Sequence, residues 1–138
     1  MKLIELQPRF VRYETRIETY AVANGDHTTW RERGCPTHEV TGPRHYSEFV
    51  DSIAEAQGIW FLCPLCFQTN GGDVGTHWCE VTFANRGASD EQGSHGHDGK
   101  PTRWDMSGTN FQDLTLTPSI DLVDGCAWHG YITNGEIR

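Results

Sequence analysis

Hydrophobic and polar positions alternate over much of this chain, with the two-residue period that is typical of half-buried β-strands. In residues 2–22, aliphatic and aromatic side chains alternate with Arg, Glu and Thr. We therefore expect one or two strands with a solvated face in this segment. The polar stretch 24–44, which contains Gly and Pro, predicts a long connection with a short strand near residues 28–31.

Further strands are predicted in the rest of the chain from short apolar runs and from alternation. Asn134-Gly135 lies between apolar positions and is a signal for a type I′ β-hairpin near the C-terminus. Residues 86–100 contain almost no apolar side chain and predict an exposed loop. The predicted strands are residues 59–62, 77–83, 103–106 and 114–120.

One segment has the features of a helix. Residues 47–57 place Ser47 at the N-cap and an apolar stripe along one face, and Gly58 supplies a C-terminal stop. One helix among many strands predicts an α+β fold dominated by antiparallel β-sheet. A chain of 138 residues has the size of a single domain. We expect residues 46–138 to form its core and residues 1–45 to form a β and loop extension.

The charge and hydropathy of the chain exclude several classes of function. The net charge of −8 at pH 7 argues against a nucleic-acid-binding surface, which needs Lys and Arg. No run approaches the roughly 18 apolar residues of a membrane span, and the N-terminus lacks the apolar core of a signal peptide. We therefore expect a cytosolic protein without nucleic-acid or membrane partners.

Two pairs of soft ligands share a spacing that suits zinc. Cys63-Pro-Leu-Cys66 and Cys126-Ala-Trp-His129 each separate two ligands by two residues. This spacing lets a tight turn direct both side chains at one ion, and two such turns make the Cys3His tetrahedron of a closed zinc site. In a reducing compartment such pairs favour a metal over disulfides. The fold is therefore expected to be built around a structural zinc ion.

Other residues compete for a place in this site. Cys35-Pro-Thr-His38 has the same spacing but lacks flanking apolar strands, and it is the principal rival pair. His77 is a further candidate to replace one ligand. Cys79 lies in a predicted strand, where core packing is the simpler interpretation.

A metal site at His95 and His97 and a redox role for Cys63 and Cys66 are both less favoured by the sequence. His95 and His97 lie in a glycine-rich loop, which would make a poor chelating site. A redox role for the first cysteine pair would require the motif to open a helix, whereas the residues after Cys66 are typical of a turn.

Several motifs of the C-terminal half recur together in one known family. They resemble those of small uncharacterised proteins carried by tailed phages and prophages, which sometimes bear the label ammonia monooxygenase. The label conflicts with the absence of a membrane span and of copper ligands, so the resemblance implies a phage accessory protein. It covers about residues 50–138 and rests on Ala56-Gln-Gly-Ile-Trp-Phe-Leu-Cys-Pro-Leu-Cys66, Gly75-Thr-His77, Arg103-Trp104, Leu114-Thr-Leu-Thr-Pro-Ser-Ile120 and Cys126-Ala-Trp-His-Gly-Tyr-Ile-Thr-Asn-Gly-Glu136.

The closed zinc site directs the functional prediction toward binding. Four protein ligands leave no open position for a catalytic water, so we expect an accessory protein that binds a host or phage protein, in the host cytoplasm or the virion. A virion decoration protein is one alternative. A zinc-dependent hydrolase is the other, with His77 as a ligand and Glu136 or Asp105 as general base, or with Ser119 as a nucleophile.

Overall fold

The computed structural model describes residues 1–24, 36–121 and 126–138. The described chain divides into two compact units, one formed by Met1–Tyr13 with Ser47–Arg138 and the other by Glu14–Tyr46. The short strand predicted near residues 28–31 lies outside the described residues, and so does Cys35.

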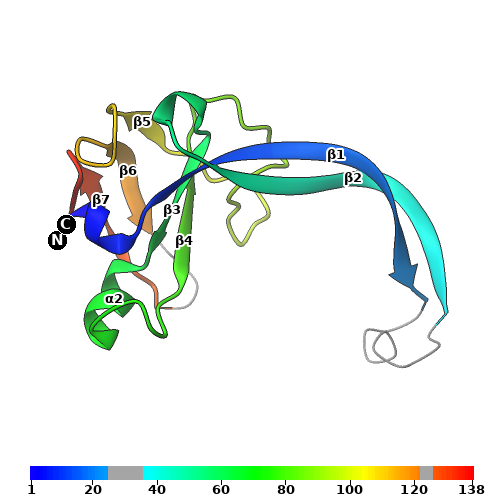
Figure 1. Ribbon diagram of the computed structural model, residues 1–138, viewed down its shortest axis with the longest axis horizontal. Helices are drawn as coiled ribbons and strands as arrows, with labels where there is room; N and C mark the ends of the chain where they lie inside the picture. The colour runs from blue at the N-terminus through cyan, green and yellow to red at the C-terminus, as the bar shows by residue number, and fades with distance from the viewer. Residues whose placement is uncertain (25–35, 122–125) are drawn as a thin grey trace. The chain divides into compact units, whose positions relative to one another are not determined.

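Regular structure is mostly β-strand (Figure 1). In the described part of the chain, the 3-10 turn η2 and the short helix α2 lie between strands, and the 3-10 turn η1 precedes the first strand. In chain order the elements are η1 (Leu3–Leu6), β1 (Arg9–Ala23), β2 (Thr37–Val50), η2 (Ile53–Glu55), β3 (Gly58–Leu62), α2 (Pro64–Asn70), β4 (Trp78–Thr82), β5 (Asp105–Ser107), β6 (Thr115–Asp121), β7 (His129–Thr133) and β8 (Glu136–Ile137).

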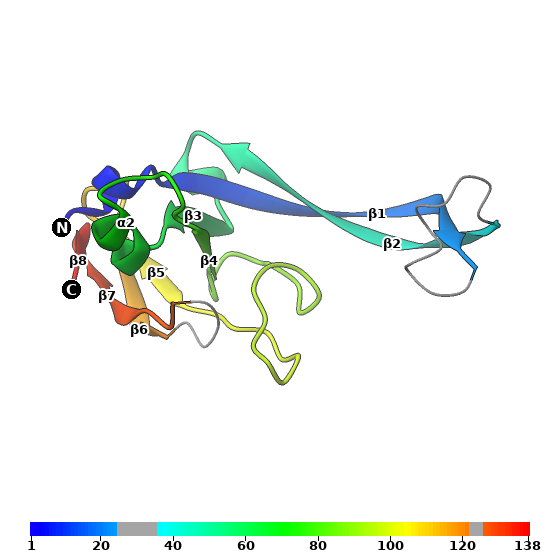
Figure 2. The same cartoon turned by 90° about the horizontal axis from the view of Figure 1, so that it is seen from below.

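The strands form two four-stranded sheets. The first has the order β2-β1-β3-β4, and the second has the order β5-β6-β7-β8, which follows the chain (Figure 2). Strand β3 pairs antiparallel with β1 and β4, and the neighbours in the second sheet are all antiparallel. These pairings confirm the predicted α+β class with mainly antiparallel sheet.

Both sheets contribute to one continuous hydrophobic core. Phe61 of β3 is fully buried and makes an edge-to-face contact with Trp128, with 6.1 Å between ring centroids. Ile120 and Ile132 bring the second sheet into the same cluster. The alternating apolar positions of the sequence therefore supply the buried faces, as their two-residue period predicts.

The helix predicted over residues 47–57 is wrong. Strand β2 continues to Val50, and only the single turn η2 follows, where the Ser52 hydroxyl accepts from the Ala54 N–H. Phe49 contacts Trp60 edge-to-face at 5.5 Å. This cross-strand packing outweighs a helical periodicity of only eleven residues, because a short helix has little intrinsic stability.

The long connection predicted over residues 24–44 is also wrong for its C-terminal part, which belongs to β2. In the unit Glu14–Tyr46, side chains pair between the two strands: the Thr19 and Thr41 hydroxyls lie 2.7 Å apart, and the Tyr46 hydroxyl donates to Glu18. Polar cross-strand pairs stabilise such a ribbon without burial, so hydropathy alone does not reveal it.

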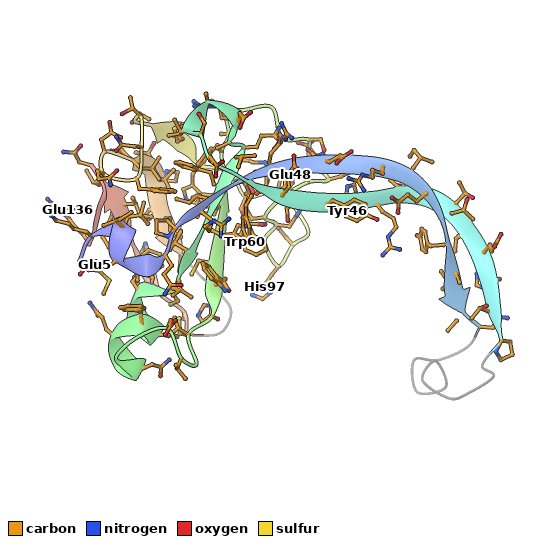
Figure 3. All side chains as sticks on the ribbon, viewed as in Figure 1. Glu5, Tyr46, Glu48, Trp60, His97 and Glu136 are labelled. Atoms are coloured by element: carbon orange, nitrogen blue, oxygen red, sulfur yellow. The ribbon has the colours of Figure 1, made fainter. Side chains whose placement is uncertain are left out.

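Two local predictions are confirmed. Asn134 and Gly135 both have positive φ, 53° and 75°, as a type I′ turn between β7 and β8 requires. A Cβ on Gly135 would lie 2.3 Å from the Gln112 carbonyl oxygen, so this position also needs glycine for space. Residues 86–100 form no helix or named strand, and Figure 3 shows His97 on this loop.

Candidate metal centre and Ser–His pair

Four side chains with soft or borderline donor atoms converge at one end of the larger unit. Cys63, Cys66, His77 and Cys126 each offer one ligand atom, and these atoms all lie within 4.8 Å of one another. The Cys126 Sγ is 3.1 Å from the Cys63 Sγ and 3.2 Å from the His77 Nε2. Figure 1 shows α2 and the ends of β3, β4 and β7, which carry or adjoin these residues, grouped at this end.

The first two ligands are positioned by a strand that runs directly into a helix. Strand β3 ends at Leu62, and Cys63 is the N-cap of α2, with Pro64 at the first helical position. The Phe67 N–H donates to the Cys63 carbonyl at 2.9 Å, which closes the first turn around Cys66. Proline suits this position because its missing N–H would have no partner there. The turn that the sequence predicted after Cys66 is therefore a helix.

His77 reaches the site through strand pairing. Strands β3 and β4 are antiparallel, with Leu62 opposite Trp78, so the next pair along is Cys63 opposite His77. The Cys63 N–H donates to the His77 carbonyl at 2.9 Å, which continues the ladder by one step. Directly opposite residues bring their Cβ atoms to about 5 Å, and this closeness places the imidazole beside the thiols.

The three thiols of this site differ in pKa because they differ in burial and in the hydrogen bonds that they make. Burial raises the pKa of Cys63 to about 11 and also raises that of Cys66. Burial likewise raises the pKa of Cys126, but hydrogen bonds from Cys63 and then from His77 outweigh it and bring the value down to about 6. The hydrogen bond to Cys126 raises the pKa of His77. Negative charge therefore concentrates on Cys126, next to a histidine that stabilises it.

This donor set fits a metal such as zinc. Three thiols and one imidazole are the ligands of a closed Cys3His site. Zinc–sulfur bonds of about 2.3 Å place the sulfur atoms of a tetrahedron roughly 3.8 Å apart, which is compatible with ligand atoms that lie within 4.8 Å of one another. In the described part of the chain, this is the group of His, Cys and carboxylate residues that lies close enough to hold an ion.

His129, the predicted fourth ligand, does not belong to this group. It is the first residue of β7 and lies on the exposed face of the second sheet. Its Nε2 is 3.0 Å from the Ser119 Oγ of β6. The group thus contains His77 in the place that spacing assigned to His129, because His129 is already the first residue of β7 and its side chain lies on the exposed face of that strand.

Ser119 lies at the end of an irregular part of β6, next to the regular pairs that adjoin His129. Leu116 pairs with Ile132, and Ile120 pairs with Gly130. Between these pairs, three residues of β6 face the single residue Tyr131 of β7. On the other side of this bulge Ile120 pairs with Gly130 and Asp121 pairs with His129, and this register places Ser119 diagonally across from His129. The Thr117–Pro118 peptide bond within the bulge is cis.

Ser119 and His129 have further neighbours that define a site. The Trp104 indole N–H donates to the Ser119 carbonyl at 3.2 Å. A cavity of about 560 Å³ adjoins His129, and its volume is within the range of small-ligand sites. It is lined by His129, Gly130, Tyr131, Thr133 and Arg138.

The two carboxylates predicted as general bases lie elsewhere. Glu136 pairs with Thr133, the last residue of β7, which is roughly 13 Å along the strand from His129. Figure 3 shows Glu136 near Glu5, consistent with the bridge between residues 2 and 136. Asp105 is exposed on β5 and pairs with Thr117. Neither residue is a member of the group formed by Cys63, Cys66, His77 and Cys126.

Two other candidate ligands lie in different environments: Cys79 is buried in the core, and His38 is exposed. Cys79 is 3 % exposed and packs in the core, as predicted. Its own partner on β3 is Phe61. His38 is exposed in the smaller unit, where its Nδ1 approaches the Asn24 Oδ1. The proposed partner of His38, Cys35, lies outside the described residues.

The sequence identified His77 and Ser119 as candidates, but it did not predict that His77 lies beside Cys63 or that Ser119 pairs with His129. Residues 59–62 and 77–83 were both predicted as strands, and an antiparallel register between them would have placed His77 opposite Cys63. The Ser119–His129 pair carries no comparable signal, because it depends on a register between β6 and β7 that sequence alone does not specify.

Comparisons with known proteins bear on function. A family described as bacterial ubiquitination-like system serine protease (BubE) matches residues 36–138. Searches of curated proteins and of solved structures produced no match. No helix within the described ranges is long and apolar enough to cross a membrane.

The family match corrects the functional prediction. A phage accessory protein that acts by binding, and the virion decoration protein given as its alternative, both conflict with a family named for a protease of a bacterial system. The matched residues include all four members of the metal-binding group together with Ser119 and His129. Because the match spans well over half of its residues, the chain belongs to the BubE family of bacterial ubiquitination-like system serine proteases.

Proposed function

We propose that this protein is a serine protease of a bacterial ubiquitination-like system, with Ser119 as the nucleophile and His129 as the general base. The observation that carries the proposal is the 3.0 Å distance between the Ser119 Oγ and the His129 Nε2. A hydroxyl within hydrogen-bond reach of an imidazole is the arrangement that activates serine in acyl transfer. The family description supports the same chemistry.

The reaction follows from this geometry. The Ser119 Oγ attacks the carbonyl carbon of the scissile bond while its proton passes to the His129 Nε2. The tetrahedral intermediate then collapses, the bond to the leaving group breaks, and His129 donates the proton to that group. A water molecule, deprotonated by His129, then attacks the acyl group on Ser119. The bond between the acyl group and the Ser119 Oγ breaks, His129 returns the proton to this oxygen, and the acid is released.

The exposed face of the second sheet provides room for a polypeptide substrate. The cavity next to His129 extends along β7 to Thr133 and Arg138. Tyr131, 54 % exposed, lies between them on this face. A substrate chain that enters this cavity would present its carbonyl group to Ser119 at the N-terminal end of β7. The substrate and other partners of such a protease would be proteins.

Asp121 is the residue best placed to orient His129. It is the cross-strand partner of His129, so both side chains lie on the same exposed face. A carboxylate that accepts from the Nδ1–H would hold the imidazole with its Nε2 toward Ser119, as the third member of a catalytic triad does.

The metal-binding group has a separate role in this proposal. We assign it a zinc ion bound by Cys63, Cys66, His77 and Cys126, which would stabilise the junction of β3, α2, β4 and β7. Four protein ligands leave no open position for a water, so the zinc-dependent hydrolase that the sequence suggested lacks its nucleophile. The described cysteines form no disulfide, so their sulfur atoms are available to bind a metal as thiolates.

The test of the nucleophile is covalent labelling with a fluorophosphonate probe, followed by peptide mapping. Ser119 is expected to carry the label, and Ser119→Ala is expected to abolish it. Ser107→Ala is the matched control, since Ser107 is an exposed serine on the neighbouring strand β5. Labelling of the wild-type protein at another residue, or none at Ser119, would contradict the assignment.

The test of the metal is elemental analysis of protein purified without added chelator. One equivalent of zinc is expected, and Cys66→Ser is expected to lower the zinc affinity because it removes one of four ligands. Retention of full zinc content after replacement of both Cys63 and Cys66 would show that the ion is bound elsewhere.

A further inference from the structure

The metal-binding group and the Ser119–His129 pair are joined by a very short segment of chain. Cys126 belongs to the first site and His129 to the second, with only Ala127 and Trp128 between them. We propose that the metal ion positions His129: by holding Cys126, it holds the start of β7 and therefore the general base. This inference rests on the proposed function, and it assigns the metal centre a role in that function beyond stabilising the fold.

The connecting segment is stiff enough to transmit such a restraint. Ala127 has a φ of 54°, a left-handed conformation that a residue with a Cβ adopts only when its surroundings hold it there. Trp128 is 8 % exposed and packs against Phe61. Gly130, on the far side of His129, would place a Cβ 2.6 Å from the Trp128 ring, so the indole lies tightly under this part of β7. Few alternative conformations are open to residues between Cys126 and His129.

The ion would connect this segment to the opposite sheet. Cys63 and His77 adjoin β3 and β4 of the first sheet, whereas Cys126 leads into β7 of the second. Without an ion, Cys126 is held to them by hydrogen bonds to one thiol and one imidazole, and thiol hydrogen bonds are weak. Bonds to a metal ion would replace these hydrogen bonds and would hold Cys126 in a fixed tetrahedral arrangement with the other ligands.

In this proposal the metal ion keeps His129 in position and takes no part in the reaction itself. With Cys63, Cys66, His77 and Cys126 as ligands, the ion would have no open position for substrate or water. A displacement of the base by about 1 Å is enough to reduce a rate by roughly 100-fold. We expect loss of the ion to slow the reaction of Ser119 with a fluorophosphonate by about tenfold or more, because the imidazole no longer stays at hydrogen-bond distance.

The experiment titrates zinc into Cys66→Ser, which retains three of the four ligands and binds the ion more weakly. Zinc occupancy, the rate of fluorophosphonate labelling at Ser119, circular dichroism and the ¹⁵N signals of the His129 imidazole are followed together. Labelling and the imidazole signals are expected to change in parallel with zinc occupancy while circular dichroism stays constant. Cys79→Ala is the matched control, because it removes a buried thiol beside the site without removing a member of the group.

A second variant decides the matter if the metal-free chain unfolds. Insertion of one glycine between Cys126 and Ala127 leaves all four ligands in place and lengthens only the connection to His129. With zinc bound, this variant is expected to label at least about tenfold more slowly than the wild type. Labelling at the wild-type rate with zinc bound would overturn the inference.

The outcomes separate this inference from the proposed function. If Ser119 of the zinc-loaded wild type is not labelled, the catalytic assignment fails. If Ser119 is labelled equally fast at all zinc occupancies in a folded protein, the catalytic assignment stands and the positioning role of the metal is refuted.

Discussion

The metal-binding group and the Ser119–His129 pair place similar demands on the chain but are built in different ways. The first gathers residues from the ends of elements in both sheets, where side chains converge on a partly buried point. The second uses two adjacent strands and lies on an exposed sheet face. The ends of elements tolerate the turns that several ligands need, whereas adjacent strands hold two groups at one defined distance.

The two histidines make this comparison specific. His77 lies just before β4 and faces Cys63 across the first sheet, and His129 begins β7 and faces Ser119 across the second. The Cys-x-x-His spacing of residues 126–129 suggests a metal ligand, yet the strand directs His129 away from the thiols. A spacing motif is therefore informative only when both of its side chains are directed at the same point.

The largest expected effects come from exchanging the two histidines for alanine. His129→Ala should slow the hydrolysis of p-nitrophenyl acetate by about 10²–10⁴-fold, the usual contribution of a general base, while zinc content remains at one equivalent. His77→Ala should instead lower the zinc affinity. The measurements are steady-state kinetics and elemental analysis on both variants. Zinc loss in His129→Ala would reverse the assignment of the two histidines.

The reactivity of the thiols sharpens the description of the metal centre. A pKa of about 6 for Cys126 makes it largely thiolate at neutral pH, whereas a pKa of about 11 keeps Cys63 protonated. In metal-free protein at pH 7, iodoacetamide should alkylate Cys126 at least about tenfold faster than Cys63. Mass spectrometry of the peptides measures both rates. Faster reaction at Cys63 would contradict the charge distribution described here, and added zinc should protect both residues.

The orienting role of Asp121 predicts a smaller effect. Asp121→Asn should lower kcat for p-nitrophenyl acetate, because the amide favours the wrong imidazole tautomer. The decrease should be less than the roughly 10⁴-fold expected for a buried triad aspartate, since Asp121 is exposed. Asp105→Asn is the control: Asp105 is on the same sheet but pairs with Thr117 and not with His129. Equal losses in both variants would point to the charge of the whole face and would remove Asp121 from the triad.

The smallest effect concerns the support of the nucleophile. Trp104→Phe removes the indole donor to the Ser119 carbonyl, a hydrogen bond worth about 1 kcal/mol, and should lower kcat by about fivefold. Trp60→Phe is the matched control, since its indole donates to Glu80 in the other sheet. Both variants should lose similar stability in urea unfolding. A decrease in kcat for Trp60→Phe of the same size would show that the effect is general.

Prediction from sequence succeeded where a signal is local. The strands around residues 59–62, 77–83 and 114–120 and the Asn134-Gly135 turn were all expected and are present. It failed over residues 47–57, where a helical pattern lies in a segment that pairs as a strand. The failure has a tertiary cause, because Phe49 packs on Trp60 and this contact is invisible in the local pattern.

The sequence by itself determined the class of fold, the short-range turns and the three cysteines that approach one another, because periodicity, turn residues and ligand spacing act over a few residues. Only the tertiary structure decided that His77 joins these cysteines and that Ser119 lies beside the other histidine, His129. Those choices depend on the register between β3 and β4 and on the register between β6 and β7. Register is set by how whole faces pack, so a single residue type at a single position does not reveal it.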